Sequence, residues 1–403
     1  MPDHDPTTEI GLEADEVGPA TEPQPLVPGV EPGHLVPYAQ AAGLAFLSLL
    51  ALGAVFLIAL KLQFPRLGAG ADPIDVLTSI VILSLALLRA PIHVGGLTFT
   101  VLPLGALALV YLLVRWSCRT AAPAAPARRG LVVGLIFAAL AAVAALIFRF
   151  RFESQPIFAG AFGSFLFSFL WVALAAAATF AAQREPLARR LGRALTSLAA
   201  RRAWLFEGIR TGIVMLGLGS VAAAAAGLLW VIVVLLTGGG PDALGAGDLV
   251  AALIYIVAFA PNLVLAVLAL SLGAPIETGA ALTVAGRLRG PLREVSVFSD
   301  GVGAAWLLLL IPLVTCAGAG FWARGNVRDP SSAATVLAVA ALVFGSTVAT
   351  LGWLGEARVG ARIASERGFG VIAPRPLIVF GAGLLWAAGA GFAGWWLAER
   401  RSS

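Results

Sequence analysis

Charged residues are scarce in this sequence. Only 12% of the 403 residues are Asp, Glu, Lys or Arg, whereas a soluble globular domain carries about 25%. Such a low density of charge cannot cover the surface of a water-soluble protein of this length. The composition therefore excludes an ordinary soluble enzyme, a nucleic-acid-binding protein and a disordered scaffold.

The residues that build common catalytic and metal sites are also few. The chain has three histidines and two cysteines, namely His4, His34, His93, Cys118 and Cys316, and they are far apart in the sequence. It contains no Gly-x-x-x-x-Gly-Lys loop, no His-Glu-x-x-His pair and no Gly-x-Ser-x-Gly turn. We therefore expect no enzymatic activity, no cofactor, no metal site and no disulfide.

Apolar residues, by contrast, make up 59% of the chain. They form ten long runs, near 38–60, 74–90, 98–115, 128–148, 158–182, 209–236, 248–272, 302–323, 332–354 and 376–397. Backbone polar groups in lipid must be bonded within their own element, so each run is predicted to be a helix. The sequence thus predicts an all-α, polytopic integral membrane bundle of about ten transmembrane helices. The run 74–90 is the shortest, and nine spans remain if it does not cross.

Charge and composition divide the chain further. Residues 1–37 hold eight acidic residues, eight prolines and no Lys or Arg, which predicts a disordered acidic tail. We expect transmembrane helices 1–5 in 38–182, a basic amphipathic cytoplasmic segment in 183–208, helices 6–10 in 209–397 and a short tail in 398–403. The segment 183–208 has leucines at helical spacing and the arginines Arg189, Arg190, Arg193 and Arg201.

Two interpretations of those arginines remain open. They could hold a surface helix against anionic lipid headgroups of the bilayer, or they could belong to an ordinary cytoplasmic loop. If all ten runs cross, one set of loops carries 20 Lys and Arg and the opposite set carries 7. This asymmetry places 61–66, 115–129, 184–210, 287–293 and 358–375 together in the cytoplasm, with the N-terminus outside.

Two similar segments predict an internal repeat. Ala90–Gly95 and Ala274–Gly279 agree at four of six positions, and each follows an equivalent span, the second and the seventh. Spans five apart would place the segments on opposite faces of the membrane, which is typical of inverted five-helix halves. Pro91, Gly95, Pro275 and Gly279 are therefore candidate functional residues. Chance similarity in a chain rich in Ala, Gly and Leu is the alternative.

Pro261 and Asn262 interrupt the seventh span and are the remaining candidates. A proline inside a helix frees a carbonyl, which a neighbouring amide can bond. If Asn262 lines a cavity between the halves, it favours a transporter or channel for a neutral solute. If it bonds the carbonyl freed by Pro261 and faces no cavity, it favours a scaffold. No ionisable residue lies in the middle third of any span, which argues against a proton-driven pump.

Four stretches also carry a family resemblance. They are Gly95–Thr98, Leu102–Gly105, Phe259–Val264 and Leu272–Gly273, and they resemble the actinobacterial multi-pass membrane family that includes the cell-division protein PerM. A second candidate is the streptophobe family. The resemblance implies a non-enzymatic protein of the bacterial inner (plasma) membrane with a structural or interaction role in cell division or envelope upkeep. It also implies membrane proteins of the division machinery as partners, and no nucleic acid.

Overall fold

A computed structural model describes residues 35–402, except for 64–71, 95–96, 124, 153–154, 185–188, 190–191, 194–195, 200–201, 237–245, 285–286, 290–291, 299–302, 328–331 and 364–365. The predicted disordered tail thus lies almost entirely outside the described residues. The N-terminal half contains α1 (Val36–Gln63), α2 (Pro73–Ala86), α3 (Leu104–Ala121), α4 (Gly130–Ile147) and α5 (Ala161–Arg184). The C-terminal half contains α7 (Ala203–Leu236), α8 (Ala246–Ser271), α9 (Leu310–Asn326), α10 (Ala333–Leu354) and α11 (Pro376–Ser402).

The predicted polytopic helical bundle is confirmed. Within the described residues, nine helices are long and apolar enough to cross a bilayer, and α2, with 14 residues, is the exception. Large apolar side chains such as Leu47, Phe162 and Leu385 are exposed on the outside of the helices, as expected where lipid is the solvent. The protein is a multi-pass membrane protein.

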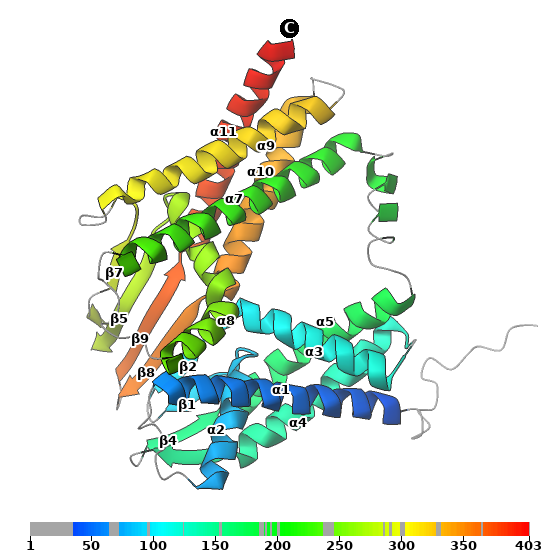
Figure 1. The fold of residues 1–403 in the computed structure, drawn as a ribbon, viewed down its shortest axis with the longest axis vertical. Helices are drawn as coiled ribbons and strands as arrows, with labels where there is room; N and C mark the ends of the chain where they lie inside the picture. Colours follow the sequence, from blue (N-terminus) through cyan, green and yellow to red (C-terminus); the bar gives the residue numbers. More distant parts are fainter. Residues whose placement is uncertain are drawn as a thin grey trace, which may run out of the picture.

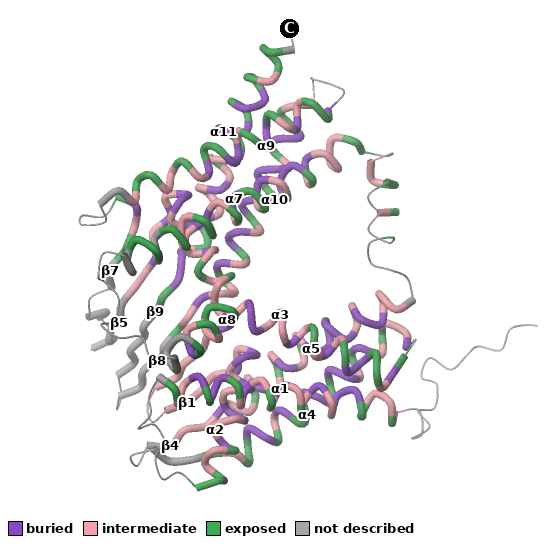
Figure 2. Tube along the Cα trace, in the orientation of Figure 1, coloured by how far each residue is buried: buried purple, intermediate pink, exposed green. Residues whose placement is uncertain are grey.

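Each half has its own hydrophobic core (Figure 2). In the N-terminal half, Leu49, Phe137 and Phe180 are fully or almost fully buried between α1, α4 and α5. In the C-terminal half, Met215, Phe344 and Ala387 join α7, α10 and α11. Glycine allows the closest of these helix contacts, since a Cβ on Gly394 of α11 would lie 1.9 Å from the Ala317 carbonyl oxygen of α9.

A nine-stranded antiparallel sheet lies along one side of the molecule, and the helices of both halves extend away from it (Figure 1). The sequence analysis did not predict this sheet. Its strands are β1 (Ile92–Val94), β2 (Leu97–Thr100), β3 (Arg149–Phe152), β4 (Gln155–Ala159), β5 (Ile276–Val284), β6 (Arg287–Arg289), β7 (Leu292–Val295), β8 (Ala357–Ile363) and β9 (Glu366–Pro374). These strands lie between the long apolar runs or at the ends of the runs. The pattern of long apolar runs therefore does not indicate them.

The two halves repeat the same element order. Two helices, a strand pair, two helices, a second strand pair and a last helix follow one another in each half. A 3-10 helix (Ala127–Arg129) is added in the first half, and β6 and a second 3-10 helix (Gly303–Leu309) are added in the second. The helix contacts correspond too: α1 packs on α3 and α4 as α7 packs on α9 and α10, and α4 packs on α5 as α10 packs on α11. The five-helix repeat proposed from the sequence is therefore present in the fold.

The prediction that the two halves are inverted relative to each other was wrong. The strand order is β3-β4-β1-β2 in the first half and continues directly as β8-β9-β5, with β7 also paired to β5. All neighbours are antiparallel, so equivalent strands run in the same direction and in the same order. A two-fold axis in the membrane plane would reverse either the direction or the order of these strands. The halves therefore share one orientation.

The helix α2 explains this difference. It packs on α1 and contacts β4 at the sheet, and its 14 residues are too few to cross a bilayer. Four described helices of the N-terminal half, α1, α3, α4 and α5, are long enough to cross. Four passes bring the chain back to its starting end. As a result, the C-terminal ends of α3 and α5 and the N-terminal ends of α4 and α7 lie away from the sheet (Figure 1).

The predicted grouping of the basic loops was wrong for the same reason. Residues 287–289, 292–293 and 358–363 belong to the sheet. The C-terminal ends of α3 and α5 and the start of α7, which carry other arginines of the same predicted set, lie at the opposite end of the helices (Figure 1). The predicted asymmetry of 20 to 7 depended on strict alternation of ten spans. With this fold the basic residues are shared between both ends, so their count no longer fixes which end is cytoplasmic.

Candidate functional site

The two repeated segments begin with the same backbone turn. Arg89 and Gly273, each just before the Ala-Pro-Ile sequence, have positive φ angles of 71° and 81°. In both halves the following alanine N–H donates to the carbonyl five residues earlier: Ala90 to Leu85 (3.2 Å) and Ala274 to Ala269 (3.1 Å). This is the Schellman ending of a helix. It turns α2 into β1 and α8 into β5.

The candidate residues of the segments have backbone and packing roles in the described structure. The Pro91 carbonyl accepts a hydrogen bond from Gly160 N at 2.8 Å, and a Cβ on Gly163 would lie 2.2 Å from Pro91 Cδ. Pro275 immediately precedes β5, and Gly279 lies within β5 opposite Leu292 and Val371. Gly95 lies outside the described residues.

Asn262 lies where the two halves meet. Its Oδ1 accepts from Leu104 N (2.9 Å), and its Nδ2 donates to the carbonyls of Leu102 (2.9 Å) and Gly355 (3.1 Å). The residue before α3 is Pro103, which has no side-chain oxygen to cap the helix. Asn262 supplies that cap from α8, and it bonds the C-cap residue of α10 at the same time.

The helix α8 joins the halves through this residue. Before Pro261, Ile254, Tyr255 and Ala258 pack in the core of the N-terminal half. After it, Leu268 and Leu272 are buried in the core of the C-terminal half. The carbonyl freed by Pro261 is that of Val257, four residues earlier, and a Cβ on Gly105 would lie 2.0 Å from its oxygen.

Asn262 also lines a pocket of about 180 Å³ between α8, the end of α10 and the sheet. The other lining residues are apolar side chains and glycines, including Phe259, Leu351 and Ile372. Asn262 thus combines features of both alternatives from the sequence. It faces a cavity, as a transport site would, but both of its amide groups are bonded to backbone, and to carbonyls other than that of Val257.

Around the junction of the two halves, one face of the sheet is polar and the other is apolar. The pairing registers place His93, Thr98, Phe158, Arg149 and Arg358 on the same face. The neighbouring residues in each strand, such as Ile92, Phe99 and Ala357, belong to the other face, which borders the pocket through Ile276, Ala357 and Ile372. Alternation with a period of two in Arg-Phe-Arg-Phe (149–152) and Ala-Arg-Val-Gly-Ala-Arg-Ile (357–363) is the sequence signal for these strands.

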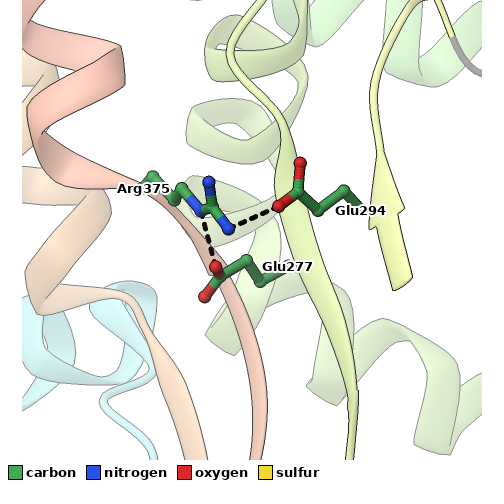
Figure 3. Close-up of polar contacts among 3 residues, drawn as sticks. All are labelled: Glu277, Glu294 and Arg375. Carbon is green, nitrogen blue, oxygen red and sulfur yellow. Dashed lines mark hydrogen bonds and ion pairs between the residues drawn. The ribbon is translucent and has the colours of Figure 1, made fainter. Parts of the chain in front are cut away.

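Equivalent positions on the polar face hold different polar groups in the two halves. In the C-terminal half, Arg375 Nε donates to Glu277 Oε1 at 2.5 Å and Arg375 Nη2 pairs with Glu294 (Figure 3). The hydrogen bond to Glu277 raises the pKa of Arg375. The corresponding positions in the N-terminal half are Gly160, His93 and Thr98.

In that half His93 Nδ1 lies 2.9 Å from Thr98 Oγ1, and the imidazole stacks on Phe158 with 4.8 Å between ring centroids. A Cβ on Gly160 would lie 3.1 Å from His93 Nε2, so the ring occupies the space that a larger residue would need. Desolvation by burial lowers the pKa of His93. This half therefore carries a neutral pair where the other carries three charges.

A third polar group lies between the halves. The Arg89 guanidinium lies over the rings of Trp353 (5.3 Å) and Phe167 (5.9 Å), and Glu356, only 5% exposed, pairs with Arg358. Burial lowers the pKa of Arg89, Glu356 opposes that shift, and Arg358 adds to it. Hydrogen bonding to Glu356 raises the pKa of Arg358. These residues were not recognised in the sequence, since nothing there brings position 89 near 356.

The predicted lipid-facing arginines are described only in part. Arg189 and Arg193 are helical and exposed, while Arg190 and Arg201 lie outside the described residues. In the described part of the chain, no three His, Cys, Asp or Glu residues are grouped to hold a metal. Comparison with family models, curated proteins and solved structures finds no match.

Proposed function

We propose that this chain is a non-enzymatic structural or interaction protein of the bacterial plasma membrane, acting in cell division or envelope upkeep. The observation that carries the proposal is the bonding of Asn262. Its amide joins α3 of one half to α8 and α10 of the other and has both of its groups bonded to backbone. A polar group that is satisfied in this way holds the halves together and is not available to a passing solute.

The family resemblance supports the same role. Leu102–Gly105 and Phe259–Val264, two of the stretches that carry it, meet in space through Asn262. Gly273, in a third stretch, forms the left-handed turn into the sheet. The resemblance therefore falls on residues that build the junction of the halves, as expected for a framework whose function depends on its shape.

A transporter or channel for a neutral solute is the alternative, and the pocket beside Asn262 favours it. The pocket is smaller than the roughly 300 Å³ at which ligand sites usually begin, and its lining is largely apolar. The transporter alternative also depended on an inverted repeat. That support is lost, because the two halves share one orientation. We therefore rank it second.

Replacing Asn262 tests the two functions against each other. Asn262→Ala leaves the Leu104 N–H and the Leu102 and Gly355 carbonyls without their partner, at a cost of about 1–3 kcal/mol each if they stay buried and unbonded. A framework protein should lose thermal stability and complementation of a deletion strain together, and recover both at low growth temperature. Asn326→Ala is the matched control, since its side chain bonds only its own helix, to Trp322 O.

Two results would contradict the proposal. One is an Asn262→Ala protein that keeps the wild-type melting temperature and membrane abundance but loses function, which is the behaviour of a solute site. The other is normal division and envelope integrity in cells depleted of the protein. A separate experiment tests the predicted partners: chemical cross-linking in intact cells, followed by identification of the captured chains, shows whether the protein contacts division proteins.

A further inference from the structure

We propose that the polar face of the sheet binds the phosphate of anionic phospholipid headgroups, at a site formed by Arg89, Arg358 and Trp353 where the two halves meet. This inference does not depend on the proposed function. It concerns a surface distinct from the basic segment 183–208, because these residues lie at the sheet, whereas α5 and α7, which that segment connects, meet it at the opposite end of the helices (Figure 1).

The balance of charge on this face favours an anion. By register, Arg149 and Arg358 belong to it, and Arg89 joins Arg358 at the junction of the halves. The carboxylates of Glu277 and Glu294 on the same face are both paired with Arg375. Guanidinium groups bind phosphate through paired N–H donors, so an excess of arginine suits a phosphate ligand.

The cluster at the junction is itself one negative charge short. Arg89 and Arg358 both interact with the single carboxylate of Glu356, and the two guanidiniums repel each other. A phosphate oxygen beside them would remove that repulsion. Arg358 is 58% exposed, so an incoming headgroup can reach it without displacing the buried Glu356.

The backbone of Arg89 provides an independent reason. A residue with a Cβ at φ 71° costs about 1–2 kcal/mol relative to the right-handed region, and the equivalent position in the other half is Gly273. The N-terminal half therefore has a strained backbone at the residue that carries the guanidinium. Strained residues of this kind often mark binding sites.

The position relative to the bilayer identifies lipid as the source of the phosphate. Trp353 is in the last turn of α10 and is 46% exposed, and Phe167 is in the second turn of α5. Both helices pass directly into strands, with one or two residues between α10 and β8 and between β4 and α5. Aromatic side chains at such helix ends are typical of the headgroup region. Inorganic phosphate is the other possible source, and it is included in the test.

The test measures thermal stabilisation of the full-length protein in neutral detergent as lipid is added. Phosphatidylglycerol should raise the melting temperature, whereas phosphatidylcholine and inorganic phosphate at the same concentration should raise it much less. Arg89→Gly and Arg358→Gln should each weaken the apparent affinity for phosphatidylglycerol about fivefold, the scale of about 1 kcal/mol per arginine at an anionic surface. Arg119→Gln, at an exposed position of α3 away from the sheet, is the matched control.

Glycine is chosen at position 89 because Gly273 adopts the same turn without strain, so the variant should fold. If it does not, the exposed Arg358→Gln variant decides alone. Unchanged affinity for phosphatidylglycerol in a folded variant would overturn the proposal. So would equal stabilisation by phosphatidylcholine, because the headgroup charge would then be irrelevant, or by inorganic phosphate, because the site would then bind a free anion.

Discussion

Arg89 and Gly273 occupy the same position in the two halves and share the left-handed backbone conformation, with φ angles of 71° and 81°. They are the two residues with positive φ in the described part of the chain. Each ends a helix and sends the chain into the sheet. The halves thus conserve a backbone turn while differing in side chain, and the difference gives one half a guanidinium at the junction with the other.

Substitutions at these two positions should separate backbone strain from side-chain contacts. Arg89→Ala loses the contacts with Trp353 and Phe167 and keeps the strain, whereas Arg89→Gly loses the contacts and relieves the strain. We expect the alanine variant to be less stable than the glycine variant by about 1 kcal/mol. Gly273→Ala should destabilise by a similar amount. Melting temperatures in detergent measure these differences in stability. Equal stability of Arg89→Ala and Arg89→Gly would show that the backbone at position 89 is not strained.

The packing of α11 on α9 should be sensitive to a side chain at Gly394 but not at Gly389. A Cβ on Gly394 would lie 1.9 Å from the Ala317 carbonyl oxygen, which cannot move without shifting α9. We expect Gly394→Ala to destabilise by about 1–3 kcal/mol, the usual cost of overpacking. Gly389→Ala on the same helix has no atom within 4 Å and should be neutral or stabilise by up to about 1 kcal/mol. A reversed order of melting temperatures would contradict this helix contact.

Removing Arg375 should expose a repulsion between Glu277 and Glu294, which lie directly opposite each other on β5 and β7. Like charges at such positions destabilise a sheet. We expect Arg375→Gln to lower the melting temperature at pH 7, and to lower it less in high salt, which screens the repulsion. Adding Glu277→Gln should restore part of the loss. A deficit of Arg375→Gln that is the same in low and high salt would argue against the repulsion.

The ion pairs of the wild-type Arg375 should hold over the whole physiological pH range. The pKa of Arg375 is raised by the bond to Glu277, so its contribution to stability is complete below its ordinary pKa and is lost only as the pH rises through the folded-state pKa.

His93 should make the fold less stable in mild acid. Burial lowers its pKa below the ordinary value of 6.5, so as the pH falls past 6.5 the unfolded chain binds a proton that the folded chain resists. Stability is then lost as the pH falls towards the folded-state pKa. We expect His93→Gln to flatten the dependence of melting temperature on pH between 5 and 7. A variant that follows the wild-type curve would show that His93 is not the group responsible.

The sequence was informative about local features. Runs such as 128–148 and 332–354 predicted α4 and α10 to within a few residues, because a helix in lipid must bury its own backbone polar groups and so needs a continuous apolar stretch. The six-residue similarity between Ala90–Gly95 and Ala274–Gly279 located the repeat. It did so because a helix end in the left-handed conformation followed by Ala-Pro-Ile is a local structure, specified by neighbouring residues.

The orientation of the halves and the polar face of the sheet depended on pairing between distant residues. Whether 74–90 crosses the membrane decides if the repeat is inverted, and its composition is compatible with either outcome; the packing of α2 on β4 decides it. Likewise, Arg89 approaches Glu356 and Asn262 approaches Leu104 only because β2 pairs with β8 and α8 lies between the cores. Apolar runs determine where the helices form. The burial of apolar surface has no preferred direction, so the arrangement of the helices is decided by the strand registers and the buried hydrogen bonds.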